Sequence, residues 1–222
     1  MPLAEGEIER ILVVTAHPDD VDFGCAGSVA AWTEQGIDVT YCIVTDGEAG
    51  GSDRSISRPD MAAIRRSEQT AAAECVGVTD IRFLGFPDGS VEANLPLRAA
   101  ISRVIRQVQP QRVVCQSPQR NFERIYASHP DHLAAAEAAL CAVYPDARNP
   151  FAHTELLDDG LEPWTAPEVW MMGGPELNVH VETTHVIDRK IKALLCHSSQ
   201  VANADAMDTL LRQWGSSDMS AC

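Results

Sequence analysis

The sequence predicts a single α/β domain in which a mostly parallel, doubly wound sheet carries helices on both faces. Two observations lead to this fold class. Short apolar runs rich in β-branched residues alternate with longer segments of helical composition over residues 11–143. The 222 residues, 45% of them hydrophobic, also suit one large domain with a substantial core. Strands that alternate with helices in this way form parallel sheets with right-handed crossovers.

The first part of the pattern contains two strands and two helices. Residues 11–15 form a continuous apolar run, which predicts a strand buried on both faces. Residues 26–35 have helical composition, and Gly36 ends that helix. A second strand is expected at 39–45, and a loop rich in Gly, Asp and Ser separates it from a strong helix at 60–76.

The same alternation continues through the next segment. A third strand is expected at 80–84 and a fourth at 112–116, with a helix at 95–108 between them that Pro110 closes. An alanine-rich helix follows at 132–143. The repeated strand–helix order is what predicts the doubly wound arrangement.

The C-terminal part, residues 150–222, is expected to close the pocket of a Rossmann-like core formed by residues 1–149. Strands are expected at 168–172 and 180–187, joined by a Gly-Gly-Pro turn. A helix capped by its first residue should follow at 188–197, and a short terminal helix after it.

The composition excludes two classes of partner. The formal net charge is −15 and the sequence pI is about 4.7, so the surface repels phosphate backbones and anionic lipid. We therefore expect neither nucleic acid nor a membrane as partner. The seven cysteines are odd in number and lack CxxC spacing, and the chain shows no apolar signal core or run of transmembrane length. These features predict a cytoplasmic protein. The sequence leaves open whether it forms a homo-oligomer.

Two clusters of metal-ligand residue types follow the first and fourth predicted strands. They are the segments 17–20 (His-Pro-Asp-Asp) and 129–132 (His-Pro-Asp-His). Open α/β folds bind ligands at the carboxyl edge of the sheet, where both clusters should lie. Two imidazoles and one carboxylate, from His17, Asp20 and His132, would leave an open position on a divalent ion, as in catalytic zinc sites.

Three further residues of these clusters fit catalytic roles. Such an ion lowers the pKa of bound water to about 7, and Asp19 stands beside the ligand pair, where it can take the water's proton. A short turn would aim His129 at the same site, where it could stabilise an oxyanion or protonate a leaving amine. Asp131 could orient that imidazole and raise its pKa.

Other interpretations of the clusters stay open. Asp and Pro are favoured at helix starts, so one cluster alone can be an ordinary cap. Two histidines and a carboxylate also bind ferrous iron in oxygenases. The strand–helix alternation argues against the all-β barrels of those enzymes, but the ligand set itself accepts Fe²⁺. A nucleotide cofactor is not expected, because the chain has no GxGxxG motif.

These residues resemble the LmbE-like deacetylase family, also called the PIG-L family. It includes deacetylases of mycothiol and bacillithiol biosynthesis and the N-acetylglucosaminyl-phosphatidylinositol de-N-acetylase. The likeness extends from residue 11 to about residue 200, and both main motifs together are specific. Its motifs lie at 16–20 and 129–132, with weaker echoes at 45–50, 64–68, 84–89 and 197–200.

The resemblance implies a Rossmann-like fold and zinc-dependent hydrolysis of an N-acetyl group, usually on a glucosamine-type sugar. It also implies a role for each site residue. The metal ligands are His17, Asp20 and His132, the general base is Asp19, and the transition-state stabiliser and acid is His129, supported by Asp131.

Three more positions bear on the substrate, and a fourth, His197, does not. Arg65 and Asp88 match positions that contact substrate hydroxyls in the sugar-binding members of the family. Arg65 can equally pair with Glu68, and Asp88 lies in a Pro-Asp-Gly turn, where Asp is common. Val21 stands where the family's first motif often has glutamate, which leaves the substrate subgroup open. His197, near a predicted helix end, is interpreted as structural.

Three functional hypotheses follow. The favoured one is a metal-dependent amidohydrolase that removes acetyl from a small N-acetylated sugar or sugar conjugate. The second keeps the site but acts on another amide or an ester. The third is a non-catalytic metal- or sugar-binding protein, and Asp19 argues against it, because a binding site needs no base beside its ligands.

Overall fold

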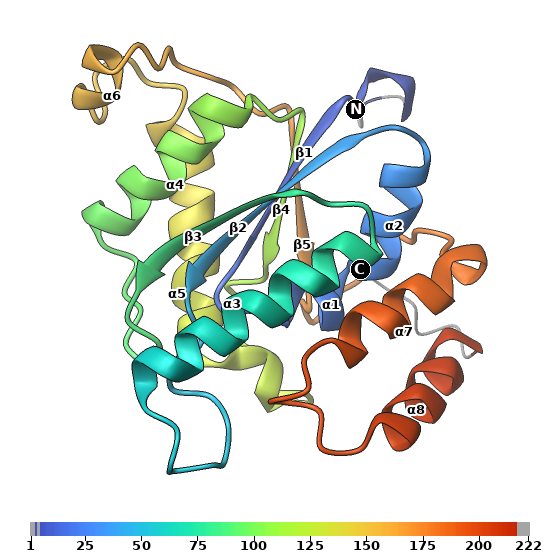
Figure 1. Cartoon of the computed structure of the whole chain (residues 1–222). Coiled ribbons are helices and arrows are strands. Elements are labelled where there is room, and N and C mark those ends of the chain that lie inside the picture. The colour runs from blue at the N-terminus through green and yellow to red at the C-terminus, as the bar shows by residue number, and fades with distance from the viewer. Residues whose placement is uncertain (1–2, 4, 217–222) are drawn as a thin grey trace.

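A five-stranded parallel sheet forms the centre of the computed structural model, which describes residue 3 and residues 5–216 (Figure 1). The strand order is β3-β2-β1-β4-β5, and every neighbouring pair is parallel. Five of the predicted strands are confirmed, and the fold class with them. The strands are β1 Arg10–Thr15, β2 Asp38–Thr45, β3 Asp80–Phe86, β4 Arg112–Gln116 and β5 Glu168–Met172.

Helices cover both faces of this sheet (Figure 1). The α-helices are α1 Asp20–Gly24, α2 Ala26–Glu34, α3 Arg58–Cys75, α4 Leu95–Val108, α5 Pro130–Cys141, α6 Glu155–Asp158, α7 Ile187–Leu195 and α8 Ala204–Ser216. Shorter turns are the 3₁₀-helices η1 Glu5–Glu7, η2 Ile125–Ser128 and η4 Thr184–Val186 and the π-helix η3 Ala142–Asp146. Among the described residues, none of these helices combines the length and the hydropathy that a bilayer crossing requires.

The core has two halves because successive residues of a strand point to opposite faces. Ile11 and Val13 of β1 pack with apolar side chains of α2, α3 and α7. Leu12 and Val14 pack on the other face with side chains of α4 and α5. All four side chains are almost completely buried, which explains why this strand is apolar without alternation.

The strand order reverses at β1: β2 and β3 are added on one side of it, and β4 and β5 on the other. From β1 the chain reaches β2 through helices on one face, whereas α4, which leads to β4, lies on the other face. The carboxyl ends of β1 and β4 are therefore adjacent. In open α/β sheets, ligands bind in the crevice outside the strands at this point.

The strand predicted at 180–187 is wrong. That segment ends in the 3₁₀ turn Thr184–Val186, and α7 starts directly after it at Ile187. The carboxylate of Glu182 accepts a hydrogen bond from the Thr184 backbone nitrogen at 2.7 Å and contacts His185 at 2.9 Å. Such local bonds compete with a strand ladder. Asp188 lies in the first turn of α7 and is not its cap.

Candidate functional site

The turn after β1 carries the first cluster. Asp19 has φ 89° and ψ −27°, a left-handed conformation, and α1 begins at the next residue. The backbone nitrogen of His17 donates a hydrogen bond to the Asp20 carboxylate at 2.7 Å. The backbone nitrogen of Ala16 donates to the side-chain oxygen of Gln116 at the end of β4, at 3.1 Å. The turn is thus closed on itself and joined to the neighbouring strand.

The second cluster begins α5. His129 is the N-cap, and its Nδ1 accepts a hydrogen bond from the Asp131 backbone nitrogen at 3.2 Å. Pro130 occupies the first helical position, and His132 lies in the first turn. The cluster thus does begin a helix, with His129 rather than an aspartate as the cap, and the same turn orients two imidazoles toward the end of β1.

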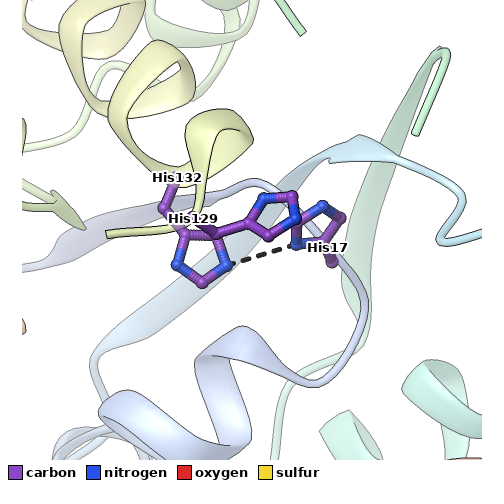
Figure 2. A group of neighbouring side chains, drawn as sticks. All are labelled: His17, His129 and His132. Atoms are coloured by element: carbon purple, nitrogen blue, oxygen red, sulfur yellow. Dashed lines mark hydrogen bonds between the residues drawn. The ribbon is translucent and has the colours of Figure 1, made fainter. Parts of the chain in front are cut away.

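The three predicted metal ligands converge. Nδ1 of His17 lies 3.3 Å from Nε2 of His132 (Figure 2), and the Asp20 carboxylate lies 3.4 Å from the first nitrogen and 3.1 Å from the second. Ligands about 2.0–2.1 Å from a tetrahedral zinc ion are about 3.3 Å apart. The two imidazole nitrogens therefore have the spacing that such an ion requires, and the carboxylate presents Oδ2 to His17 and Oδ1 to His132.

A third imidazole adjoins this group. Figure 2 shows His129 beside His17 and His132, and one nitrogen of each ring lies within 4.8 Å of the others. The ring centroids of His129 and His17 are 5.0 Å apart and nearly perpendicular. His129 is exposed, whereas the other two rings are half-buried, so His129 is the imidazole most accessible to a substrate.

The other edge of His17 faces two carboxylates. Its Nε2 lies 3.1 Å from Asp88 and 3.2 Å from Asp131. Both carboxylates are fixed by backbone amides, since Asp131 accepts from Gly89 at 2.7 Å and Asp88 accepts from Ala49 at 2.9 Å. Histidine ligands of metals commonly donate their second N–H to a carboxylate in this way, which leaves the first nitrogen free to bind. His17, Asp88 and Asp131 also form a second possible donor group.

The balance of charge at the site favours a cation. The carboxylates of Asp19, Asp20, Asp88 and Asp131 gather around His17. Burial by itself lowers the pKa of His17, but hydrogen bonds with Asp20 and Asp88 outweigh it and raise that pKa to about 11. The same group of carboxylates is the donor chemistry that a divalent ion prefers.

The carboxylates of the turn differ in pKa. Burial raises the pKa of Asp19, as does the neighbouring Asp20, and although Arg65 opposes both, that pKa reaches about 7. Burial also acts to raise the pKa of Asp20, but the two imidazoles of His132 and His17 hold it well below its usual range. One carboxyl group is thus poised to exchange a proton near neutrality while its neighbour stays ionised.

The pKa of His129 lies below its usual value. Partial desolvation is the main cause, and the nearby imidazoles of His17 and His132 add to it, whereas Asp131 acts in the opposite direction. Asp131 therefore acts to raise the pKa of His129, as predicted, but the other effects outweigh it. The direct contact of the Asp131 carboxylate is with His17.

Arg65 and Asp88, the predicted substrate contacts, both lie beside the site. The buried guanidinium of Arg65 donates to the carbonyl oxygens of Pro18 and Gly47 and lies 3.1 Å from the Asp19 carboxylate. Asp88 contacts His17 and the backbone of Ala49, as described above. That either side chain also touches a substrate stays a prediction.

Three buried residues behind the site were not predicted to belong to it. They are Asp22, Gln69 and His197, which are hydrogen-bonded to one another and to the backbone of Asp19. The motif at 197–200 was a signal for His197, but its position near a helix end favoured a structural interpretation. Nothing in the spacing of the other two residues pointed to the site.

The sequence model of the family described as GlcNAc-PI de-N-acetylase, PIG-L, matches residues 12–143, more than half of the chain. Two curated proteins are similar over most of their length. Diacetylchitobiose deacetylase of Thermococcus kodakarensis is 31% identical over 194 residues, 87% of this chain and 71% of that protein. A probable N-acetyl-alpha-D-glucosaminyl L-malate deacetylase 2 of Bacillus anthracis is 30% identical over 200 residues, 87% of this chain and 82% of that protein.

A solved structure extends the similarity to three dimensions. N,N'-diacetylchitobiose deacetylase from Pyrococcus horikoshii, in complex with its inhibitor MPG, superimposes with a TM-score of 0.86 at 28% identity. The alignment covers 94% of this chain and 77% of that one. It therefore includes both the sheet and the C-terminal part.

Proposed function

The chain belongs to the GlcNAc-PI de-N-acetylase family, PIG-L, whose members are metal-dependent deacetylases, and on that premise we propose that it removes the N-acetyl group from an N-acetylglucosamine-type sugar or sugar conjugate. The single observation that carries the proposal is the convergence of His17, Asp20 and His132, with Asp19 at their side. The family premise supplies the reaction, and the geometry supplies the residues.

The metal is proposed to be zinc, held by His17, Asp20 and His132. The spacing of the donor atoms suits a tetrahedral ion, and the carboxylates behind His17 suit a histidine that binds metal. When bound, such an ion lowers the pKa of water to about 7 and polarises a carbonyl group. The zinc identity and the cytoplasmic location stay predictions.

Asp19 is proposed as the general base. Its carboxylate adjoins that of Asp20, and the buried Arg65 holds it at 3.1 Å. In this position it accepts the proton that the attacking water loses as the bond to the acetyl carbon forms. A pKa near neutrality, raised by burial, suits a group that must later return the proton.

His129 is proposed to stabilise the oxyanion. Its Nδ1 already accepts a hydrogen bond from the Asp131 backbone, so in the neutral ring the proton lies on Nε2. The lowered pKa favours this neutral form, which can still donate a hydrogen bond to the developing oxyanion. The sugar amine then leaves with the proton that Asp19 took from the attacking water.

The substrate class is inferred from the relatives. Diacetylchitobiose and N-acetylglucosaminyl malate, named for two of them, share an N-acetylglucosamine unit. Arg65 and Asp88 are proposed to lie close to the sugar, since both adjoin the site. The part of the substrate beyond the sugar is left open, as Val21 already indicated.

The test is amine release by purified protein loaded with zinc. N,N'-diacetylchitobiose and N-acetylglucosamine should yield free amine and acetate, a chelator should abolish the reaction, and added zinc should restore it. N-acetylated amino acids and p-nitrophenyl acetate serve as comparison substrates. Turnover of only these compounds would favour the second hypothesis, and zinc binding without turnover of any compound would favour a binding protein.

A further inference from the structure

The backbone of Asp19 is unusual for a residue that carries a side chain. Its φ of 89° lies in the left-handed region, which residues other than glycine occupy at a cost in free energy. Since α1 begins at the next residue, this conformation decides the direction in which the Asp19 carboxylate leaves the chain. Neighbouring groups must therefore hold the turn in place.

Gln69 holds the backbone amide of Asp19. Its side-chain oxygen accepts a hydrogen bond from that amide at 2.8 Å, and its side chain is completely buried. Gln69 lies about one turn after Arg65 on α3, and Arg65 contacts the Asp19 carboxylate. Two residues on one face of α3 thus contact the proposed base, Gln69 at its backbone and Arg65 at its side chain.

Asp22 and His197 determine which way the Gln69 amide points. The Gln69 side-chain nitrogen donates to Oδ2 of Asp22 at 2.9 Å. The same Asp22 oxygen lies 2.8 Å from Nε2 of His197. The Gln69 nitrogen is the donor to Asp22, so the Gln69 oxygen is left to accept from the Asp19 amide. Asp22 and His197 have no exposed surface, so water does not compete for these bonds.

His197 is itself anchored to α3. Its backbone nitrogen donates to Leu194 at the end of α7 at 3.1 Å. The next two residues, Ser198 and Ser199, bind the carboxylate of Glu68, the neighbour of Gln69 on α3, at 2.7–2.9 Å. His197 is therefore held from two sides, by α7 and by α3.

We propose that Gln69, Asp22 and His197 are positioning residues, which fix the left-handed backbone of Asp19 and so aim its carboxylate for proton transfer. The inference rests on the proposed function. It adds a role for the C-terminal part, because His197, just after the end of α7, acts on the base through Asp22 of α1 and Gln69 of α3. A merely structural network would stabilise the fold without affecting Asp19 in particular.

Gln69→Met tests the contact with Asp19, because methionine fills a similar volume but accepts no comparable hydrogen bond. We expect kcat with N,N'-diacetylchitobiose to fall by about 10²-fold, since small displacements of a catalytic group have effects of this size. KM and zinc content should stay close to those of the unaltered protein. The Asp19 amide should exchange its hydrogen about tenfold faster by NMR, because its hydrogen bond is lost.

Position 197 tests the far end of the network. His197→Met removes the donor to Asp22, whereas His197→Gln keeps an N–H group at nearly the same place. We expect His197→Met to lower kcat and to speed exchange of the Asp19 amide, and His197→Gln to recover most of both. If His197→Met does not fold, the comparison of Gln69→Met with His197→Gln still decides the case.

His153→Met is the matched control. His153 also contacts a buried aspartate, since its Nε2 lies 3.2 Å from Asp146, but that pair has no link to Asp19 among the described contacts. This variant should lower stability and leave kcat and the Asp19 exchange rate unchanged. Folded Gln69→Met protein with unaltered kcat and unaltered exchange would overturn the proposal, as would a loss of kcat that is matched by loss of zinc.

The two levels of inference fail in different ways. If the unaltered protein releases no amine from any acetylated sugar, the proposed function is wrong, but the exchange rate of the Asp19 amide still reports on the network. If it is active and the Gln69 and His197 variants are equally active, only the positioning role is wrong.

Discussion

Two buried polar clusters at opposite ends of the sheet are built from similar parts. The site-side cluster comprises Asp22, Gln69 and His197, and the far cluster comprises Arg98, Arg106, Asp146 and His153. Each contains a histidine–aspartate contact, at 2.8 Å in the first and 3.2 Å in the second. Each cluster also involves a non-glycine residue with a left-handed backbone. The first contacts Asp19, and the second contains such a residue, His153.

The clusters differ in what they hold. The site-side cluster ends on the amide of Asp19, next to the metal-ligand residues. In the far cluster, Arg98 binds Asp146 through two bonds of 2.8 Å. The Arg106 guanidinium donates to backbone carbonyl oxygens of the segment that carries α6, at the other end of the molecule (Figure 1).

If the proposed roles hold, similar polar chemistry serves the reaction at one end of the sheet and folding at the other. A long segment without strands needs internal hydrogen bonds to stay packed, and Arg106 satisfies its carbonyl groups. The site-side cluster has no such segment to hold. Changes on the site side should therefore reduce turnover, whereas changes in the far cluster should reduce stability.

The largest effect is expected for His132→Ala. It removes one of the three proposed ligands and leaves Asp20 without its 3.1 Å contact, so zinc binding should fail and amine release should drop below detection. Zinc content after dialysis and the rate with N,N'-diacetylchitobiose measure the two losses. If the variant kept both zinc and activity, His132 would not be a metal ligand, and the proposed metal site next to the site-side cluster would be wrong.

Asp19→Asn should have the next largest effect. The amide cannot accept the proton, so kcat should fall by about 10²–10⁴-fold, while the zinc content stays near that of the unaltered protein. Thermal unfolding should change little, because the backbone contact with Gln69 remains. Near-normal turnover in this variant would show that Asp19 is not the general base.

Arg98→Met should have the smallest effect, confined to stability. Burial by itself would raise the pKa of Asp146, but bonds from Arg98 and His153 outweigh it and hold that pKa below its usual range. Without Arg98 the protein should lose about 1–3 kcal/mol of unfolding free energy near neutral pH, with kcat unchanged.

The pH dependence of this loss follows from the sign of the shift. A lowered folded-state pKa stabilises the protein fully above the ordinary aspartate value of about 3.9, and the contribution disappears as the pH falls through the lower folded value. Urea unfolding of both proteins should therefore differ near neutrality and converge in acid. A loss of kcat in Arg98→Met would break the division between the two clusters.

The sequence alone predicted the sheet and the convergence of His17, Asp20 and His132 at its edge. Strands such as β1 are apolar on both faces, and that pattern survives any detail of packing. His17 and His132 were found because each follows a strand and belongs to a short motif. Convergence at the carboxyl edge then depends only on strand order.

The supporting residues were harder to predict, because tertiary contacts decide them. Gln69 is one of several polar residues on α3, and only the packing of α3 against the turn brings it to Asp19. The segment 180–187 is rich in the β-branched residues typical of strands, but the Glu182 side chain bonds to Thr184 and His185, and a 3₁₀ turn forms instead. The left-handed backbone of Asp19 leaves no trace in composition at all.

That backbone has a consequence for how position 19 tolerates change. Glycine would fit the φ of 89° without steric conflict and would relieve about 1 kcal/mol, yet it would delete the carboxylate. Folding and turnover therefore favour different residues at this one position. A variant of this chain that gains thermal resistance through Asp19→Gly would do so by giving up its reaction.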